Sequence, residues 1–155
     1  MAAPRSALGV APAGSELPAD FAPRLRMATM RLARLLRQHA DPDHSQTLIS
    51  ALATVARCGP VTLGRLAELE AVQPPSMTRI VAKLEELGLV ARVTDDADRR
   101  VARVSVTPAA EELLADVRTR RNELLAQRLV DLQPEELAAL QAALPALERL
   151  AGLPS

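Results

Sequence analysis

The chain has 155 residues, the length of about one ordinary domain. Its 19 basic and 19 acidic residues give no net charge, which argues against a protein that coats nucleic acid through charge alone. A single Cys excludes a disulfide framework and a Cys-based metal cluster within one chain. Because Phe21 is the one aromatic residue, base-stacking platforms are excluded, and a core of Ala, Leu and Val favours packed helices.

The first 20 residues are rich in Ala, Pro, Gly and Ser and have no hydrophobic periodicity. The apolar stretch 7–10 is interrupted by Gly9 and is shorter than the roughly 7–15 apolar residues of a signal peptide. No later segment approaches the roughly 18 apolar residues of a membrane span. We therefore expect residues 1–20 to be a flexible tail on a cytoplasmic protein.

Two helices are predicted next. Apolar residues at spacings of three and four predict a helix over 22–40, which Asp41-Pro42 ends because the residue before proline avoids helical dihedrals. A second helix is predicted over 45–57, before Gly59-Pro60.

The middle of the chain combines short helices with a hairpin. Thr62 caps a short helix over 63–70, and Pro74 begins another over 74–87, which Gly88 ends. This last helix is expected to bury Met77, Ile80, Val81, Leu84 and Leu87. Residues 89–93 and 101–106 are short β-branched runs around a polar loop, and they predict a β-hairpin with a long, charged tip.

Two more helices complete the chain. Thr107-Pro108 predicts a helix over 108–129, and Gln133-Pro134 begins the last one. Apolar residues of the last helix follow spacings of three and four: Leu137, Leu140, Leu144, Leu147 and Ala151. Such a seam is typical of packing on a partner helix, and the pattern leaves open whether that helix belongs to the same chain.

The two short helices, their three-residue turn and the hairpin have the order of a winged helix-turn-helix, in which the second helix enters the DNA major groove. On that helix Thr78, Arg79 and Lys83 stand opposite the apolar side, and Ser76 is at its border. Arg can pair with guanine, and hydroxyls near a helix start can bind phosphate. Taken alone, the pattern equally fits a surface helix with a solvated basic face.

Asp98, Arg99 and Arg100 form the tip of the predicted hairpin. There, two guanidinium groups can reach a minor groove, and Asp98 can orient one of them. The alternative is a solvated loop that discourages edge aggregation. Residues 62–107 hold seven basic and seven acidic residues, so we expect local clusters of charge to carry any DNA binding.

Three segments resemble the MarR family of bacterial transcriptional regulators: PPSMTRIVAKLEELGLV (74–90), DDADRR (95–100) and VSVTPAAEELL (104–114). The resemblance extends over nearly everything after residue 20. It implies a mainly α, winged helix-turn-helix fold of about six helices and a two- to three-stranded β-wing. It also implies a homodimer that reads a palindromic operator in double-stranded DNA, as a repressor relieved by a small molecule or a stress signal.

The resemblance places recognition contacts on Ser76, Thr78 and Arg79, and wing contacts at the hairpin tip. The full set of predicted DNA-binding residues is Thr62, Pro75, Ser76, Thr78, Arg79, Lys83, Asp98, Arg99 and Arg100. Ala71 stands where the family often has Gly, and Gln73 where it often has Ser. We therefore expect a less tight turn that lacks one phosphate-binding hydroxyl.

The predicted organisation is a tail (1–20), a dimerisation helix (21–44), a winged helix-turn-helix domain (45–106) and C-terminal dimerisation helices (107–153). In the family's layout an effector lies between the dimer helices and the winged domain. Here that region includes Leu36, Leu48, Leu52 and Leu113. Such a pocket would offer little aromatic stacking to a phenolic ligand.

Other functions have weaker support. Cys58 is expected to be a small buried side chain rather than an oxidant sensor. His39, Asp41, Asp43 and His44 fit a helix stop and cap better than a zinc site, so no metal or cofactor is predicted.

An enzyme is disfavoured because the chain has no nucleophile elbow and no Gly-rich phosphate loop, and no catalytic residue is predicted. The main alternative is a helical dimerisation module that binds another protein through residues 107–153, without DNA readout.

Overall fold

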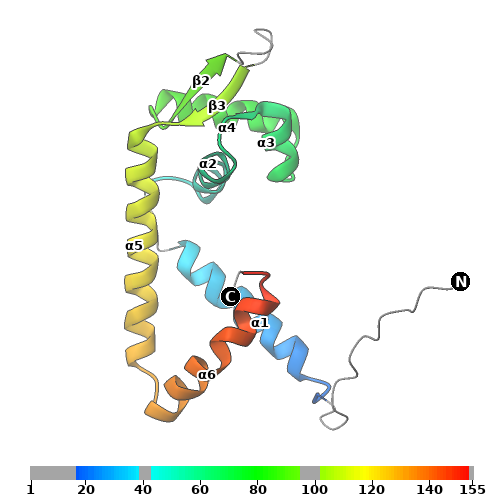
Figure 1. Cartoon of the computed structure of the whole chain (residues 1–155), viewed down its shortest axis with the longest axis vertical. Helices are drawn as coiled ribbons and strands as arrows, with labels where there is room; N and C mark the ends of the chain where they lie inside the picture. The colour runs from blue at the N-terminus through cyan, green and yellow to red at the C-terminus, as the bar shows by residue number, and fades with distance from the viewer. Residues whose placement is uncertain (1–16, 39–42, 95–101, 154–155) are drawn as a thin grey trace, which may run out of the picture. The chain divides into compact units, whose positions relative to one another are not determined.

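The computed structural model describes residues 17–38, 43–94 and 102–153. The elements follow in the order α1 (Phe21–Gln38), α2 (Gln46–Cys58), β1 (Val61–Thr62), α3 (Leu63–Leu69), α4 (Pro74–Glu86), β2 (Val90–Thr94), β3 (Ala102–Val106), α5 (Pro108–Val130) and α6 (Pro134–Leu150) (Figure 1). The predicted mainly α fold with a small β-wing is confirmed. Among the described residues, no helix is apolar over a length that could cross a membrane.

By its internal contacts the chain divides into the units Met1–Ala33 and Arg34–Ser155. The first unit contains most of α1, a helix without a buried residue. Asp20 stands just before this helix and accepts a hydrogen bond from Arg24 at 3.3 Å. The flexible tail predicted for residues 1–20 lies mostly outside the described residues.

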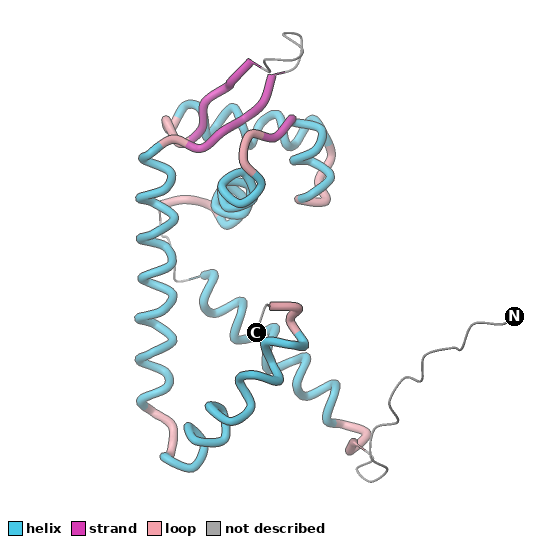
Figure 2. Tube along the Cα trace, in the orientation of Figure 1, coloured by secondary structure: helices cyan, strands magenta, loops and turns pink. Residues whose placement is uncertain are grey.

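A three-stranded antiparallel sheet with the strand order β1-β3-β2 lies in the second unit (Figure 2). The hairpin of β2 and β3 pairs Val90 with Val106 and Thr94 with Ala102. β1 pairs with the other edge of β3, and it places Val61 opposite Val104. The hairpin was predicted from the sequence, whereas β1 has two residues and is too short to show a period.

Threonine side chains cap the first turns of α3 and α5, as the sequence predicts. Thr62 accepts a hydrogen bond from the Arg65 amide at 3.3 Å, and Thr107 accepts one from the Ala110 amide at 3.4 Å. These bonds satisfy N–H groups that have no partner inside the helix. Both predicted caps are therefore confirmed.

The main core of the second unit forms where α2, α3, α4 and β3 meet. Its fully buried side chains include Leu52, Leu66, Met77, Val81, Leu84 and Val104. α4 therefore buries Met77, Val81 and Leu84 as predicted, whereas Ile80 is only half-buried against the core. The prediction was wrong for Leu87, which is 40% exposed because α4 ends at Glu86 and Leu87 is its C-cap.

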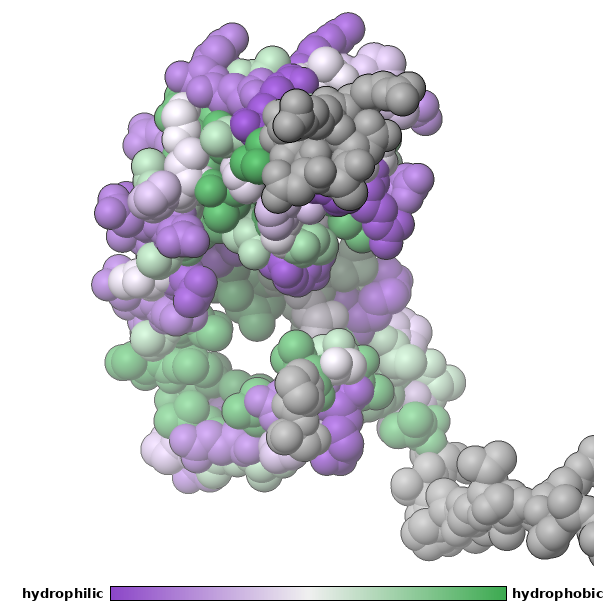
Figure 3. All heavy atoms as spheres, turned by 45° about the horizontal axis from the view of Figure 1, so that its top comes forward, coloured by the Kyte–Doolittle hydropathy of each residue, from purple (hydrophilic) through white to green (hydrophobic). Residues whose placement is uncertain are grey.

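α5 joins this core through Ala110 and forms a smaller cluster with α2, in which Ile49 packs with Val117. The rest of α5 and the whole of α6 are less covered, and α6 has no buried residue. In Figure 3, hydrophobic residues gather at the lower left, over the C-terminal half of α5. The side chain of Val130 at the end of α5 is 83% exposed.

Candidate nucleic-acid interface

α3, a short turn and α4 form the helix-turn-helix, and a Schellman motif ends each of the two helices. After α3 the Val72 amide donates to the Ala67 carbonyl at 3.0 Å, and Ala71 has a φ of 52°. After α4 the Leu89 amide donates to the Leu84 carbonyl at 2.9 Å, and Gly88 has a φ of 69°. Glycine adopts this left-handed conformation freely, whereas it costs an L-residue such as Ala71 roughly 1–2 kcal/mol.

The expectation of a less tight turn at Ala71 was wrong, because the alanine adopts the conformation that glycine favours. The expectation of a missing hydroxyl at Gln73 is consistent with the structure. Gln73 is the N-cap of α4 and its side chain makes no capping hydrogen bond. The first turn of α4 needs no such cap, because Pro74 and Pro75 have no N–H group and the Ser76 amide donates to the Gln73 carbonyl at 2.9 Å.

The outward face of α4 carries most of the predicted major-groove residues. Pro75, Ser76, Thr78, Arg79 and Lys83 are all exposed. They lie opposite the face that α4 buries in the core. The Thr78 hydroxyl donates to the Pro74 carbonyl at 3.0 Å, so its oxygen remains able to accept.

Ion pairs explain how a neutral domain can still present positive charge. Arg65 pairs with Glu68 at 2.9 Å, Lys83 with Glu86 at 2.8 Å, and Arg92 with Glu85 at 2.8 Å. Arg79, by contrast, pairs with no acid in the described part of the chain. Its guanidinium is therefore a positive group on α4 that an acidic neighbour does not neutralise.

The remaining predicted contacts belong to segments outside α4. Thr62 is half-buried, and its side chain is engaged as the cap of α3. Asp98, Arg99 and Arg100 lie outside the described residues, in the segment that joins β2 to β3. The structure thus brings Pro75, Ser76, Thr78, Arg79 and Lys83 together on one helix.

A polar contact that the sequence analysis missed connects α3 to α2. The Ser50 hydroxyl donates to Glu70 Oε2 at 2.7 Å, and the Thr54 hydroxyl donates to Glu70 Oε1 at 2.5 Å. Thr54 is 6% exposed. Ser50 and Thr54 are four residues apart and share a face of α2, which is the signal that the sequence offered. Glu70 therefore holds the end of the first helix of the helix-turn-helix on α2.

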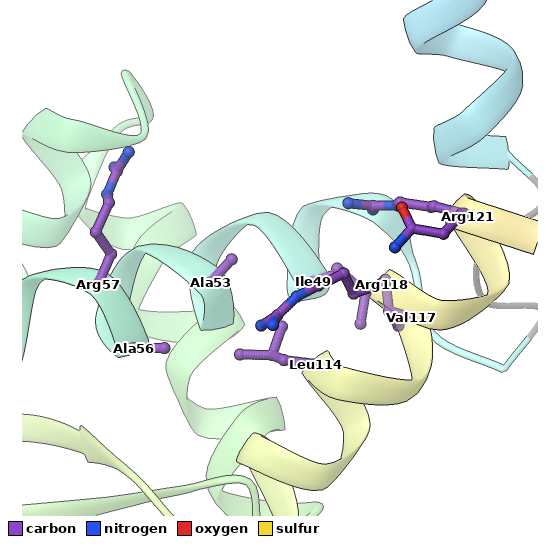
Figure 4. A pocket seen from close by; sticks show the side chains of 9 residues that line it. Ile49, Ala53, Ala56, Arg57, Leu114, Val117, Arg118 and Arg121 are labelled. Atoms are coloured by element: carbon purple, nitrogen blue, oxygen red, sulfur yellow. The ribbon is translucent and has the colours of Figure 1, made fainter. Parts of the chain in front are cut away.

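A pocket of about 440 Å³ lies between α2 and α5 (Figure 4). Ile49, Ala53 and Ala56 of α2 and Leu114 and Val117 of α5 give it apolar walls. Three arginines also line it: Arg57, Arg118 and Arg121. In Figure 4, Arg57 and Arg121 lie at opposite ends of the pocket. The Arg121 Nε atom is buried and has no hydrogen-bond partner among the described residues.

None of the predicted effector leucines lines this pocket. Leu52 is fully buried in the main core, and Leu48 and Leu113 pack against that core. Leu36 is half-buried near the end of α1. Neighbouring positions line the pocket instead, because one residue along a helix turns the side chain by about 100°.

Cys58 is exposed, so the expectation of a buried cysteine was wrong. It is the last residue of α2 and lies beyond the buried face of that helix. His39 and Asp41 of the suggested metal turn lie outside the described residues.

The MarR family model matches residues 45–102 of the chain. An HTH-type transcriptional regulator of Mycobacterium tuberculosis is 41% identical over 126 residues, which are 81% of this chain and 88% of that protein. The crystal structure of a transcriptional regulator protein from Pseudomonas aeruginosa matches with a TM-score of 0.73 at 31% identity. The match covers 87% of this chain and 96% of that chain. A mutant of MepR from S. aureus, bound to an oligodeoxyribonucleotide, has a TM-score of 0.65 at 17% identity and covers 84% and 97% of the two chains.

The contact of Glu70 with α2 predicts a stability effect. Replacing Glu70 by Ala removes the acceptor of two hydroxyl groups and leaves the buried Thr54 hydroxyl unsatisfied. We expect a loss of about 1–3 kcal/mol in the free energy of unfolding, measured by urea denaturation. The control is Glu68→Ala, whose exposed ion pair with Arg65 is worth at most about 1 kcal/mol. Equal losses in the two variants would contradict the assigned role of Glu70.

Proposed function

Because the chain belongs to the MarR family of transcriptional regulators, we propose that it is a repressor that binds a palindromic operator as a homodimer and releases it when a small molecule binds. At the level of the family, the chain is a winged helix-turn-helix, DNA-binding regulator. The observation that carries the finer proposal is the exposed polar face of α4, on which Arg79 has no acidic partner among the described residues. The oligodeoxyribonucleotide complex of MepR, which has the same fold, supports a role in binding duplex DNA.

Exposed apolar side chains on the terminal helices support a homodimer. On α1 they include Phe21 and Met30, which are 47% and 57% exposed. On α6, Leu140 and Leu144 of the predicted seam are 44% and 52% exposed. Leaving such side chains in water is unfavourable by about 1.5–3 kcal/mol each relative to burying them. A second copy of the chain would cover them, and its two-fold symmetry would be matched by a palindromic operator.

The dimer can be tested on α6. Leu144→Asp places a charge in the proposed apolar interface of both copies, so the dissociation constant of the dimer should rise about a hundredfold or more. Sedimentation equilibrium measures that constant. Ala142→Asp adds the same charge on the opposite side of the helix and should leave it within about threefold. A Leu144→Asp chain that dimerises as tightly as the wild type would exclude α6 from the interface.

DNA binding is proposed to use α4 in the major groove and the hairpin tip in the minor groove. Arg79 would pair with a guanine edge, the Ser76 hydroxyl would donate to a phosphate, and the Thr78 oxygen would accept from a base amino group. Arg99 and Arg100 would enter the minor groove, where negative potential attracts guanidinium groups. Lys83 is already paired with Glu86, so its contribution should be smaller.

Fluorescence anisotropy on the duplex upstream of the chain's own gene, at 150 mM salt and with random duplex as competitor, tests this interface. Arg79→Ala should weaken specific binding by about 1–3 kcal/mol and relax specificity at one base pair. Lys83→Ala is the matched control and should lose less. The Arg99→Ala/Arg100→Ala double variant should lose specific binding. Equally weak binding by all these chains, repeated on duplexes selected from random DNA, would instead favour the protein-binding module.

Release of the operator is proposed to follow when an organic anion with an apolar body binds in the pocket between α2 and α5. The apolar walls suit such a body, and three arginines can meet its charge. The unpartnered, buried Nε atom of Arg121 supports this proposal, because a buried donor without an acceptor is unfavourable. Since the chain has no Trp and no Tyr, the apolar part of the ligand is expected to be aliphatic.

Octanoate is a suitable probe of this pocket, and 1-octanol is its uncharged counterpart. A ligand at a hundred times its dissociation constant stabilises the native state by about 2.7 kcal/mol, so octanoate should raise the Tm of the wild type. The Arg118→Ala/Arg121→Ala double variant should lose that increase. Arg120→Ala, an exposed arginine of α5 outside the pocket lining, should keep it. A similar increase with octanol would show that the arginines do not select the anion.

A further inference from the structure

We propose that Glu85 and Arg92 are positioning residues: their ion pair fixes the wing (β2 and β3) at a set angle to α4, so that both elements reach their grooves together. The proposal rests on the proposed DNA-binding function. It assigns Arg92 a role in holding the wing rather than in contacting DNA.

The pair connects the last turn of α4 to the middle of β2. The Nε atom of Arg92 donates to Glu85 Oε1 at 2.8 Å, and its second guanidinium nitrogen donates to Glu85 Oε2 at 3.2 Å. Two parallel hydrogen bonds fix the direction of both side chains, which a single contact does not. The hydrogen bonds that Glu85 accepts, and then its negative charge, raise the pKa of the Arg92 guanidinium above its ordinary value.

The register of the hairpin explains why an ion pair is needed at this position. Arg92 lies opposite Val104, so the two side chains stand on the same face of the sheet, the face that α4 and the core cover. Val90, two residues earlier on the same face, is 4% exposed and anchored by apolar contacts. At Arg92 β2 becomes exposed while Val104 opposite it on β3 stays buried, and on β2 the carboxylate of Glu85 replaces apolar packing as the anchor.

The anchors of the wing therefore follow one another from base to tip. At the base, the Thr107 hydroxyl donates to the Gly88 carbonyl at 2.7 Å. Val90 is the next anchor on β2, and the Glu85–Arg92 pair follows it, level with the buried Val104 of β3. β3 is also supported by β1 at Arg103 and Val104, whereas β2 beyond Val90 has only its pairing with β3 and the bond to Glu85. Without this bond β2 could shift relative to α4, and the hairpin would then meet DNA at varying angles.

The mutation Glu85→Gln distinguishes this proposal from a direct contact of Arg92 with DNA, because the two predict opposite changes in affinity. If Arg92 acted on DNA through its charge, Glu85→Gln would free that charge, remove a negative group and tighten binding. If the pair positions the wing, Glu85→Gln weakens specific binding despite the gain in positive charge. Glu86→Gln is the matched control, because Glu86 is the next residue and pairs with Lys83 instead.

The experiment uses the full chain and a duplex selected from random DNA by the wild type, with anisotropy measured against that duplex and against random DNA. We expect Glu85→Gln and Arg92→Gln each to weaken binding to the selected duplex about fivefold, the effect of a pair worth about 1 kcal/mol. The double variant should be no weaker than Arg92→Gln. The exchanged pair Glu85→Arg/Arg92→Glu should recover part of the loss, whereas Glu86→Gln should not weaken binding.

A second measurement needs no DNA. Hydrogen exchange of the free protein should become faster in β2 and β3 for Glu85→Gln and remain unchanged for Glu86→Gln. Tighter specific binding by Glu85→Gln, or unchanged exchange of the hairpin amides, would overturn the proposal. If the wild type selects no duplex, the proposed DNA-binding function fails, and the exchange data still decide whether the pair holds the wing.

Discussion

The buried face of α4 is the constraint on which the rest of the winged domain depends. Met77, Val81 and Leu84 are almost completely removed from water, and they hold α4 on the core that α2 and α3 provide. Because these positions are spaced by four and three, burying them turns Ser76, Thr78 and Arg79 outward. The same packing that stabilises the domain therefore selects the side chains that can meet DNA.

The acidic residues of the winged domain account for its lack of net charge. Glu68, Glu85 and Glu86 each pair with a basic side chain, and Glu70 accepts two hydroxyl hydrogen bonds. Each of these acids thus has a local partner, so none of the four opposes Arg79. Overall charge is for this reason a poor guide to DNA binding in this chain, because the distribution of the pairs decides which cations remain available.

Local signals made much of this structure predictable. The caps at Thr62 and Thr107, the glycine after α4 and the apolar spacing of α4 each act within a few residues, so the sequence alone indicates them. Contacts between distant segments were missed, including β1 on β3 and Glu70 on α2. The exposure of Cys58 was also missed, because a single residue at a helix end has no pattern that reports burial.

The contacts of α5 and α2 connect the walls of the pocket to α4 and α3. Thr107 caps α5 and also binds the Gly88 carbonyl, so the start of α5 is attached to the end of α4. Arg118 lies 11 residues further along α5, a distance of about 16 Å in a rigid helix. On the opposite wall, Ser50 and Thr54 connect α2 to the end of α3 through Glu70. A ligand that changes the separation of α2 and α5 would therefore act on both helices of the helix-turn-helix.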